Sequence, residues 1–264
     1  MNTQRIRVII SKEWMDMGKN KMVLIMMALL PVLLVGMVLG TTYFMARAPE
    51  QDFEPGAGSG IALPPEMAHL DPKTGTIIMM NDQYMFYLLL IPMALPVYIA
   101  AYSIIGEKET RSLEPLLATP ISTAELLVGK TIAAVTPAVL LAWGSFAFTA
   151  LGMYIIASPL IFEYLVRPVW TLSMAIQAPL FALLSTSCGV IASSRMNDPR
   201  AAQQVTALFV VPVVGLSMLV LMGRLYLSLQ LLLWATLLMV LVNVGVLWLA
   251  VKLFQRETIL TRWK

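Results

Sequence analysis

Long apolar runs alternate with short polar connections along almost the whole chain. Each run has about 18 residues or more, and about 20 helical residues cross the hydrocarbon core of a bilayer. A transmembrane barrel would instead show segments of about ten residues that alternate in polarity, and no such segments occur. The pattern therefore predicts an all-α membrane protein with six transmembrane helices. We place the spans at residues 22–45, 84–105, 131–157, 169–193, 204–222 and 229–253.

The basic residues lie mainly on one side of these spans. Of the 18 Lys and Arg residues, 14 lie in residues 1–21, 106–130, 194–203 and the C-terminal tail. Cytoplasmic loops are enriched in Lys and Arg, so both termini are predicted to be cytoplasmic in a multi-pass protein of the cell (inner) membrane. The connection 46–83 is then external. Its many Pro, Gly and acidic residues predict an irregular loop, with room for a short helix near 65–70.

The first 21 residues have the pattern of an amphipathic helix. Apolar residues recur at three- and four-residue spacing, with basic residues along the edge of the stripe. We expect this helix to lie in the cytoplasmic interface of the lipid bilayer, with an indole at headgroup depth. A solvated arm that carries only topogenic charge is the alternative. The residues concerned are Ile6, Ile9, Ile10, Trp14 and Met17, flanked by Arg5 and Lys12.

Composition supports the membrane prediction and excludes several kinds of chemistry. The chain is 59% hydrophobic and 12% charged, whereas a soluble domain has roughly 25% charged residues. It is predicted to form a single transmembrane domain over residues 1–264. We expect no ionisable residue near the centre of any span, which disfavours an ion-coupled transporter. The one histidine, His69, lies in the external loop without the partners of a metal site or a catalytic base, so neither is expected.

A nucleotide site is also not expected in this chain. The segment AELLVGKT, residues 124–131, ends like a phosphate-binding GxxxxGK[ST] loop. It begins with Ala124 where that loop needs glycine, and it follows no strand. No cofactor is therefore predicted here, and nothing in the sequence indicates a nucleic-acid partner.

The cytoplasmic connection 106–130 is unusually rich in structure-specifying residues. From residue 107 it reads EKETRSLEPLLATPISTAELLVGK. Thr110 can cap a short helix over about 111–118, and Ser122 to Glu125 match the capping box that begins a helix. Topology alone favours Lys and Arg, yet the segment has four Glu against three basic residues, which favours a docking surface for a partner protein. A solvated hairpin is the alternative.

This connection closely resembles the signature of the ABC type-2 transporter permease family, in the form E-K-E-x-x-x-L-E-x-L-L-A-T-P-I-S-x-x-E-L-L-x-G-K. Arg111-Ser112 stand where the family usually has Gly-Thr. The segments ASSRMNDPRAAQQ (192–204) and FQRETIL (254–260) are also similar to family members, so the resemblance covers essentially the whole chain. The signature positions are Glu107, Lys108, Glu109, Leu113, Glu114, Leu116, Leu117, Thr119, Pro120, Glu125, Gly129 and Lys130.

The resemblance implies a six-span permease subunit that forms a homodimer or a heterodimer with a second permease. It implies that a separate ABC ATPase subunit binds ATP and Mg²⁺, and that a coupling helix between spans 2 and 3 contacts this ATPase during export. An alternative within the family is a complex that performs mechanical or maturation work without moving a solute. A lipid, a drug, a peptide and an ion all remain open as substrates. The implied ATPase contacts are Glu107, Glu109, Arg111, Glu114, Leu116, Leu117 and Pro120.

Overall fold

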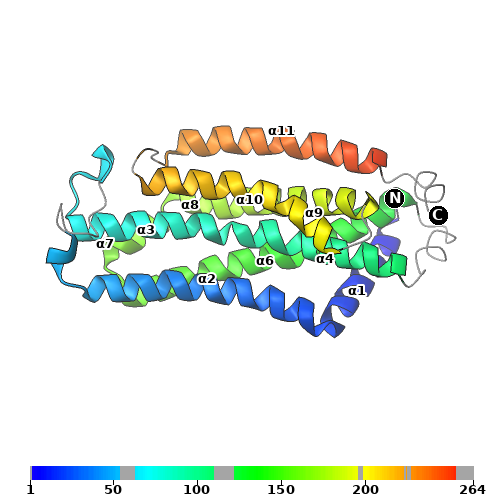
Figure 1. Cartoon of the computed structure of the whole chain (residues 1–264), viewed down its shortest axis with the longest axis horizontal. Coiled ribbons are helices and arrows are strands. Elements are labelled where there is room, and N and C mark those ends of the chain that lie inside the picture. Colours follow the sequence, from blue (N-terminus) through cyan, green and yellow to red (C-terminus); the bar gives the residue numbers. More distant parts are fainter. Residues whose placement is uncertain are drawn as a thin grey trace.

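The computed structural model describes residues 2–53, 63–109, 122–195, 199–222, 224 and 227–253, and within these ranges the regular elements are all helices. The long helices run side by side along the long axis of the molecule (Figure 1). Among the described residues, five segments are long and apolar enough to cross a bilayer, so the chain is a helical multi-pass membrane protein. They are Val23–Arg47, Pro72–Val97, Ala124–Ile156, Pro159–Ala192 and Leu229–Lys252.

The remaining long helix, α10 (Pro199–Leu221), runs alongside these segments (Figure 1). Its 23 residues correspond to a length of about 34 Å. Within the described part of α10, the apolar stretch Val211–Leu221 is shorter than the five apolar segments named above.

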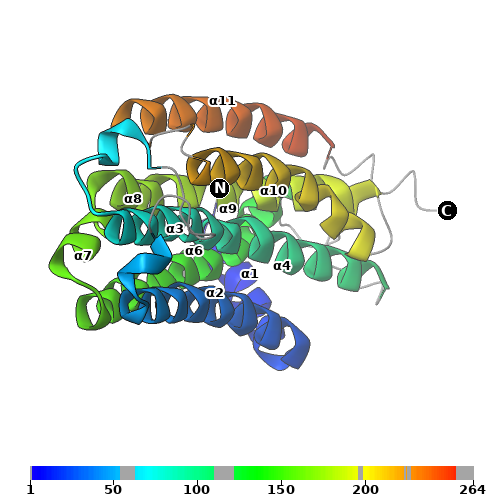
Figure 2. The ribbon, with the colours of Figure 1, turned by 60° about the vertical axis from the view of Figure 1, so that its left-hand side comes forward.

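Two helices form the centre of the bundle, α4 (Leu90–Glu109) and α9 (Ala178–Arg195), which pack against each other. A Cβ atom built at Gly189 would lie 2.9 Å from Cγ2 of Val97, so only glycine fits this approach. Around the pair lie α2 (Lys21–Arg47), α6 (Thr123–Ile156), α10 and α11 (Leu229–Leu253). In both views α2 and α11 lie on opposite sides of the centre (Figures 1 and 2).

The predicted second span differs from the observed one. A helix, α3 (Pro72–Leu88), begins twelve residues before the expected position 84 and occupies part of the expected loop 46–83. Its start is specified by Asp71, whose carboxylate accepts a hydrogen bond from the Thr74 amide at 2.9 Å, and by Pro72 in the first turn. The pass continues as α4 after a break at Leu89. Pro92 explains this break, because it has no N–H for the carbonyl of Leu88.

Other boundaries lie close to the expectations, with two differences. The third span was expected from residue 131, but α6 begins at Thr123 and is 34 residues long. The fourth, expected at 169–193, is divided into α8 (Pro168–Leu172), the π-helical segment η3 (Ser173–Gln177) and α9. Short helices at one end of the bundle are η1 (Glu50–Phe53), η2 (Pro65–Met67) and α7 (Pro159–Leu165).

At the opposite end α1 (Thr3–Lys19) leaves the direction of α2 and lies obliquely to the bundle (Figure 1). Asn20 makes this change of direction. Its extended backbone ends α1, and its side-chain oxygen accepts a hydrogen bond from the Val23 amide in the first turn of α2. A single residue therefore ends one helix and caps the next.

The close approach of α4 and α9 predicts a specific cost for enlarging Gly189. We expect Gly189→Ala to destabilise the protein by about 1–3 kcal/mol, because the new methyl group overlaps Val97 and the helices must separate. Gly245→Ala in α11 is the matched control, since its Cβ would meet nothing within 4 Å and alanine favours a helix. Thermal unfolding in detergent compares the two; equal melting temperatures would contradict this packing.

Candidate functional site

The helix α1 packs on the first turns of α6, and we call this contact the α1–α6 junction. It includes residues on both sides of the segment 110–121, because α4 ends at Glu109 and α6 begins at Thr123. Its members are Asn2, Arg5, Ile9, Glu13 and Trp14 of the N-terminal region, Ser103 of α4, and Ser122, Glu125, Gly129, Lys130 and Ala133 of the α6 region.

The capping box predicted at the start of α6 is present and does more than begin the helix. The hydroxyl of Ser122 accepts a hydrogen bond from the Glu125 amide at 3.2 Å, and Oε2 of Glu125 accepts one from the Ser122 amide at 3.0 Å. The other oxygen, Oε1, accepts a hydrogen bond from the amide of Asn2 at 2.7 Å. Nη1 of Arg5 lies 3.7 Å from Oε2. One carboxylate therefore joins the starts of α1 and α6.

A buried ion pair forms the second connection. Nζ of Lys130 donates a hydrogen bond to Oε1 of Glu13 at 2.7 Å, and the two side chains are only 3% and 7% exposed. Nζ also donates to the hydroxyl of Ser103. The ammonium group thus binds residues of α1, α4 and α6 at one point. Removing either charge would leave the other buried without its counterion, which is strongly unfavourable.

The pKa of Glu13 reflects this environment. Burial acts to raise it, but the positive charge of Lys130 and the hydrogen bonds from Lys130 and Ser103 together outweigh burial, with Lys12 adding a smaller contribution. The pKa of Glu13 is therefore below its ordinary value of 4.5. Glu13 is ionised at neutral pH, as the pair with Lys130 requires.

Two further contacts fix the angle at which α1 crosses α6. A Cβ atom at Gly129 would lie 2.8 Å from Cγ2 of Ile9, so glycine permits close approach of the helices. Nε1 of Trp14 donates a hydrogen bond to the carbonyl of Ala133 at 3.1 Å. That carbonyl lies four residues before Pro137, which has no N–H to offer it. The proline thus creates an acceptor inside α6, and the indole of α1 satisfies it.

The sequence-predicted site residues divide into three groups. Arg5, Lys12 and Trp14 lie on α1 as expected, and Arg5 and Trp14 contact the α6 region. Glu107 and Glu109 lie in the last turn of α4. Arg111, Glu114, Leu116, Leu117 and Pro120 lie outside the described residues, so their contact with an ATPase stays a prediction.

Sequence reasoning missed Glu13 and Ser103. Glu13 did carry a signal, because it lies four residues after Ile9 and four before Met17. An acidic residue on the apolar stripe of an amphipathic helix needs a buried partner. Its partner, Lys130, could be recognised in the sequence only as a basic residue of the family signature. Nothing in the sequence indicated that Lys130 contacts Glu13.

A second buried charge corrects an expectation. Asp82 was expected in the external loop 46–83, yet it lies within the apolar segment Pro72–Val97 and is 4% exposed. Nη2 of Arg167 lies 2.6 Å from Oδ2 of Asp82, and Nε1 of Trp170 donates to Oδ1 at 2.7 Å. The ring of Phe86 packs edge-to-face on Trp170. This network joins α3 to α8 at the end of the bundle away from α1.

The buried pair of the α1–α6 junction predicts strong coupling between its members. We expect Glu13→Gln to destabilise the protein by about 3 kcal/mol, because it leaves the ammonium of Lys130 buried without a counterion. In a double-mutant cycle with Lys130→Met, the second change should cost much less than it does alone. Asp16→Asn, an exposed position of the same helix, is the control and should be nearly neutral. Additive effects in detergent unfolding would contradict the pair.

The lowered pKa of Glu13 predicts a pH dependence. A carboxylate whose folded pKa is depressed contributes stability above its unfolded pKa, near 4.5, and loses this contribution as the pH falls through the folded pKa. We expect the melting temperature of the wild type to fall more between pH 6 and acidic values below about 4.5 than that of Glu13→Gln. The difference between the two curves isolates Glu13, and parallel curves would contradict this role.

Comparison with known families gives one match. A family described as ABC-2 family transporter protein matches residues 7–233, which is 227 of the 264 residues. The matched range contains most of α1, all of α2 to α10 and the start of α11, and therefore nearly the whole α1–α6 junction. A search of curated proteins finds no match.

Proposed function

The chain belongs to the ABC-2 transporter family, as a multi-pass permease subunit, and we propose that it dimerises and couples to a separate ATPase subunit to export a substrate across the cell membrane. ATP and Mg²⁺ are bound by the partner subunit in this proposal. The observation that carries it is the α1–α6 junction, which holds both flanks of the segment proposed to contact the ATPase.

The junction gives a physical path for coupling. Ser103 of α4 lies shortly before the segment 110–121, and Lys130 of α6 lies shortly after it. The ammonium group of Lys130 donates a hydrogen bond to Ser103 and so joins the two helices. A displacement of the segment must therefore move α4 and α6 together instead of bending one of them. The capping box and the contact of Asn2 with Glu125 add α1 to the same unit. Rigid elements of this kind transmit domain movements in switching proteins.

The arrangement of the helices supports six crossings with both termini in the cytoplasm. The start of α1 and the end of α11 lie at the same end of the bundle (Figure 1). Counting α3 and α4 as one crossing, and α10 as another, gives an even number of crossings between them. The excess of Lys and Arg at this end favours the cytoplasmic side. We infer that α1 lies at the cytoplasmic surface of the lipid, with part of Trp14 exposed.

The ATPase contact is tested by neutralising three acidic residues of the connection 106–130, which we call the coupling segment. The chain is co-purified with the ATPase subunit and reconstituted in vesicles, and Glu107, Glu109 and Glu114 are replaced together by Ala. We expect at least about a tenfold loss of co-purification and of permease-stimulated ATP hydrolysis, because several charged contacts at an interface are lost together.

The matched control is Glu163→Ala in α7, an exposed acidic residue at the opposite end of the bundle. It should leave both measurements unchanged. If assembly and ATPase stimulation survive the triple change, the assignment of the coupling segment is wrong. Coupled ATP hydrolysis without movement of any solute would instead contradict export and favour mechanical work by the complex.

A further inference from the structure

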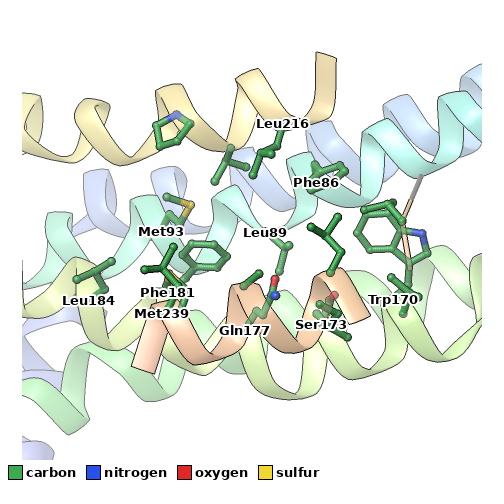
Figure 3. Close-up of a pocket in the computed structure, with 18 of the residues that line it drawn as sticks. Phe86, Leu89, Met93, Trp170, Ser173, Gln177, Phe181, Leu184, Leu216 and Met239 are labelled. Carbon is green, nitrogen blue, oxygen red and sulfur yellow. The ribbon is translucent and has the colours of Figure 1, made fainter. Parts of the chain in front are cut away.

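A cavity of about 360 Å³ lies between the central helices and the last two helices (Figure 3). It opens at the surface of the bundle, where Leu216 and Leu238 of its lining are exposed. Its walls come from α3, α4, the segment α8–η3–α9, α10 and α11. Figure 3 shows Trp170 toward one end of the labelled side chains, Leu184 toward the other and Gln177 between them. Small-molecule sites typically have volumes of about 300–1,000 Å³.

The lining is almost entirely apolar. It includes Phe86, Leu89, Met93, Phe181, Leu216 and Met239, and its polar members are Ser173, Gln177 and Ser228. No ionisable side chain is present among the lining residues, so a charged ligand would lose its hydration without compensation. Ordered water needs two to four polar partners, and in this lining only the region of Ser173 and Gln177 offers them. Hydrocarbon is the physical filling for the rest of the cavity.

The side chain of Gln177 indicates that a ligand of this cavity also needs a polar group. Gln177 is only 8% exposed, and its carboxamide makes no hydrogen bond with the described residues. Ser173, one turn earlier, is 3% exposed and its hydroxyl is likewise without such a bond. Ser228 differs, since its hydroxyl accepts a hydrogen bond from the Leu231 amide at the start of α11. A ligand group that pairs with the carboxamide of Gln177 therefore supplies a hydrogen bond that the described residues do not.

The backbone around Gln177 is specialised. Ser173 and Gln177 are the first and last residues of the π-helical segment η3, and such segments occur frequently at functional sites. Nε1 of Trp143 donates a hydrogen bond to the carbonyl of Met174 within it, at 2.8 Å. At the outer end of the cavity Trp170 is held by Asp82. The polar group and the end wall of the cavity are therefore both fixed in position.

We propose that this cavity binds a neutral, elongated amphipathic molecule of the lipid class. Its hydrocarbon chain packs on the apolar lining, and its single polar group, a hydroxyl or a carbonyl, pairs with the carboxamide of Gln177. A transmembrane helix of a second copy is about 10 Å wide and is too wide to enter this cavity, so it would only cover the open side, which is one outcome of the test below. This binding site is independent of the proposed coupling to an ATPase.

The test uses the full chain in lipid nanodiscs and two photoreactive probes. One is a long-chain alcohol with a diazirine in its chain, and the other is the alkane of the same length and diazirine position. Labelled peptides are mapped by mass spectrometry, with excess unlabelled alcohol as competitor. We expect competable labelling of the lining segments of α9 and α11, about fivefold stronger for the alcohol than for the alkane, as one hydrogen bond predicts.

Two variants separate the apolar and polar parts of the site. Gln177→Leu keeps the bulk of the side chain and breaks no hydrogen bond to the described residues, so it should fold and label equally with both probes. Ala235→Trp fills the cavity from α11 and should abolish competable labelling by both. Leu233→Trp, on the exposed face of the same helix and outside the lining, is its control and should label like the wild type.

Three outcomes would overturn the proposal. The first is labelling that excess alcohol does not displace and that Ala235→Trp does not change. The second is an alcohol preference that persists in Gln177→Leu, which would remove the assigned polar contact. The third is labelling that disappears whenever the chain is isolated as a dimer, because a second copy would then cover the cavity.

Discussion

The ion pair of Lys130 and Glu13 is the interaction on which the end of the bundle depends. Two charges are taken out of water there, so each is unfavourable without the other. Because Lys130 also binds Ser103, the pair requires α1, α4 and α6 to keep one mutual arrangement. Apolar packing alone would tolerate sliding of these helices, since lipid solvates an apolar side chain as well as a protein neighbour does. The polar contact therefore supplies the specific register that hydrophobic contacts in a membrane lack.

Tryptophan residues provide a second set of specific contacts between helices. The indole N–H of Trp14 binds the carbonyl that Pro137 leaves unpaired, that of Trp143 binds a carbonyl in the π-helical segment, and that of Trp170 binds Asp82. In each case an irregularity or a buried charge creates an acceptor inside the bundle, and a large amphipathic side chain from another helix or segment satisfies it. Each of these positions therefore becomes a specific hydrogen-bonded contact between two helices or segments.

Much of the fold was predictable from the sequence, because a bilayer restricts the chain to apolar helices of known length. The helices α2 and α11 begin and end within two residues of the segments predicted for the first and last spans, and the capping box of Ser122 and Glu125 is confirmed. The start of α3 was not predicted, since Asn81, Asp82 and Gln83 make its sequence polar. These side chains are buried, with Asn81 bound to Thr42 and Asp82 to Arg167. The hydropathy of one segment does not show which distant residues its polar side chains will bind. For the same reason the pairing of Glu13 with Lys130 could not be predicted.

The sequence separation of the polar contacts has a consequence for biosynthesis. Asn2 and Glu125 are 123 residues apart, Glu13 and Lys130 are 117 apart, and Asp82 and Arg167 are 85 apart. A ribosome therefore releases α1 with its acidic residue long before the matching lysine exists. During that interval Glu13 must stay hydrated at the membrane surface, so α1 docks only after α6 has been inserted. The amphipathic character of α1 thus serves nascent-chain assembly, because the helix can bind at the membrane interface until α6 has been synthesised and inserted.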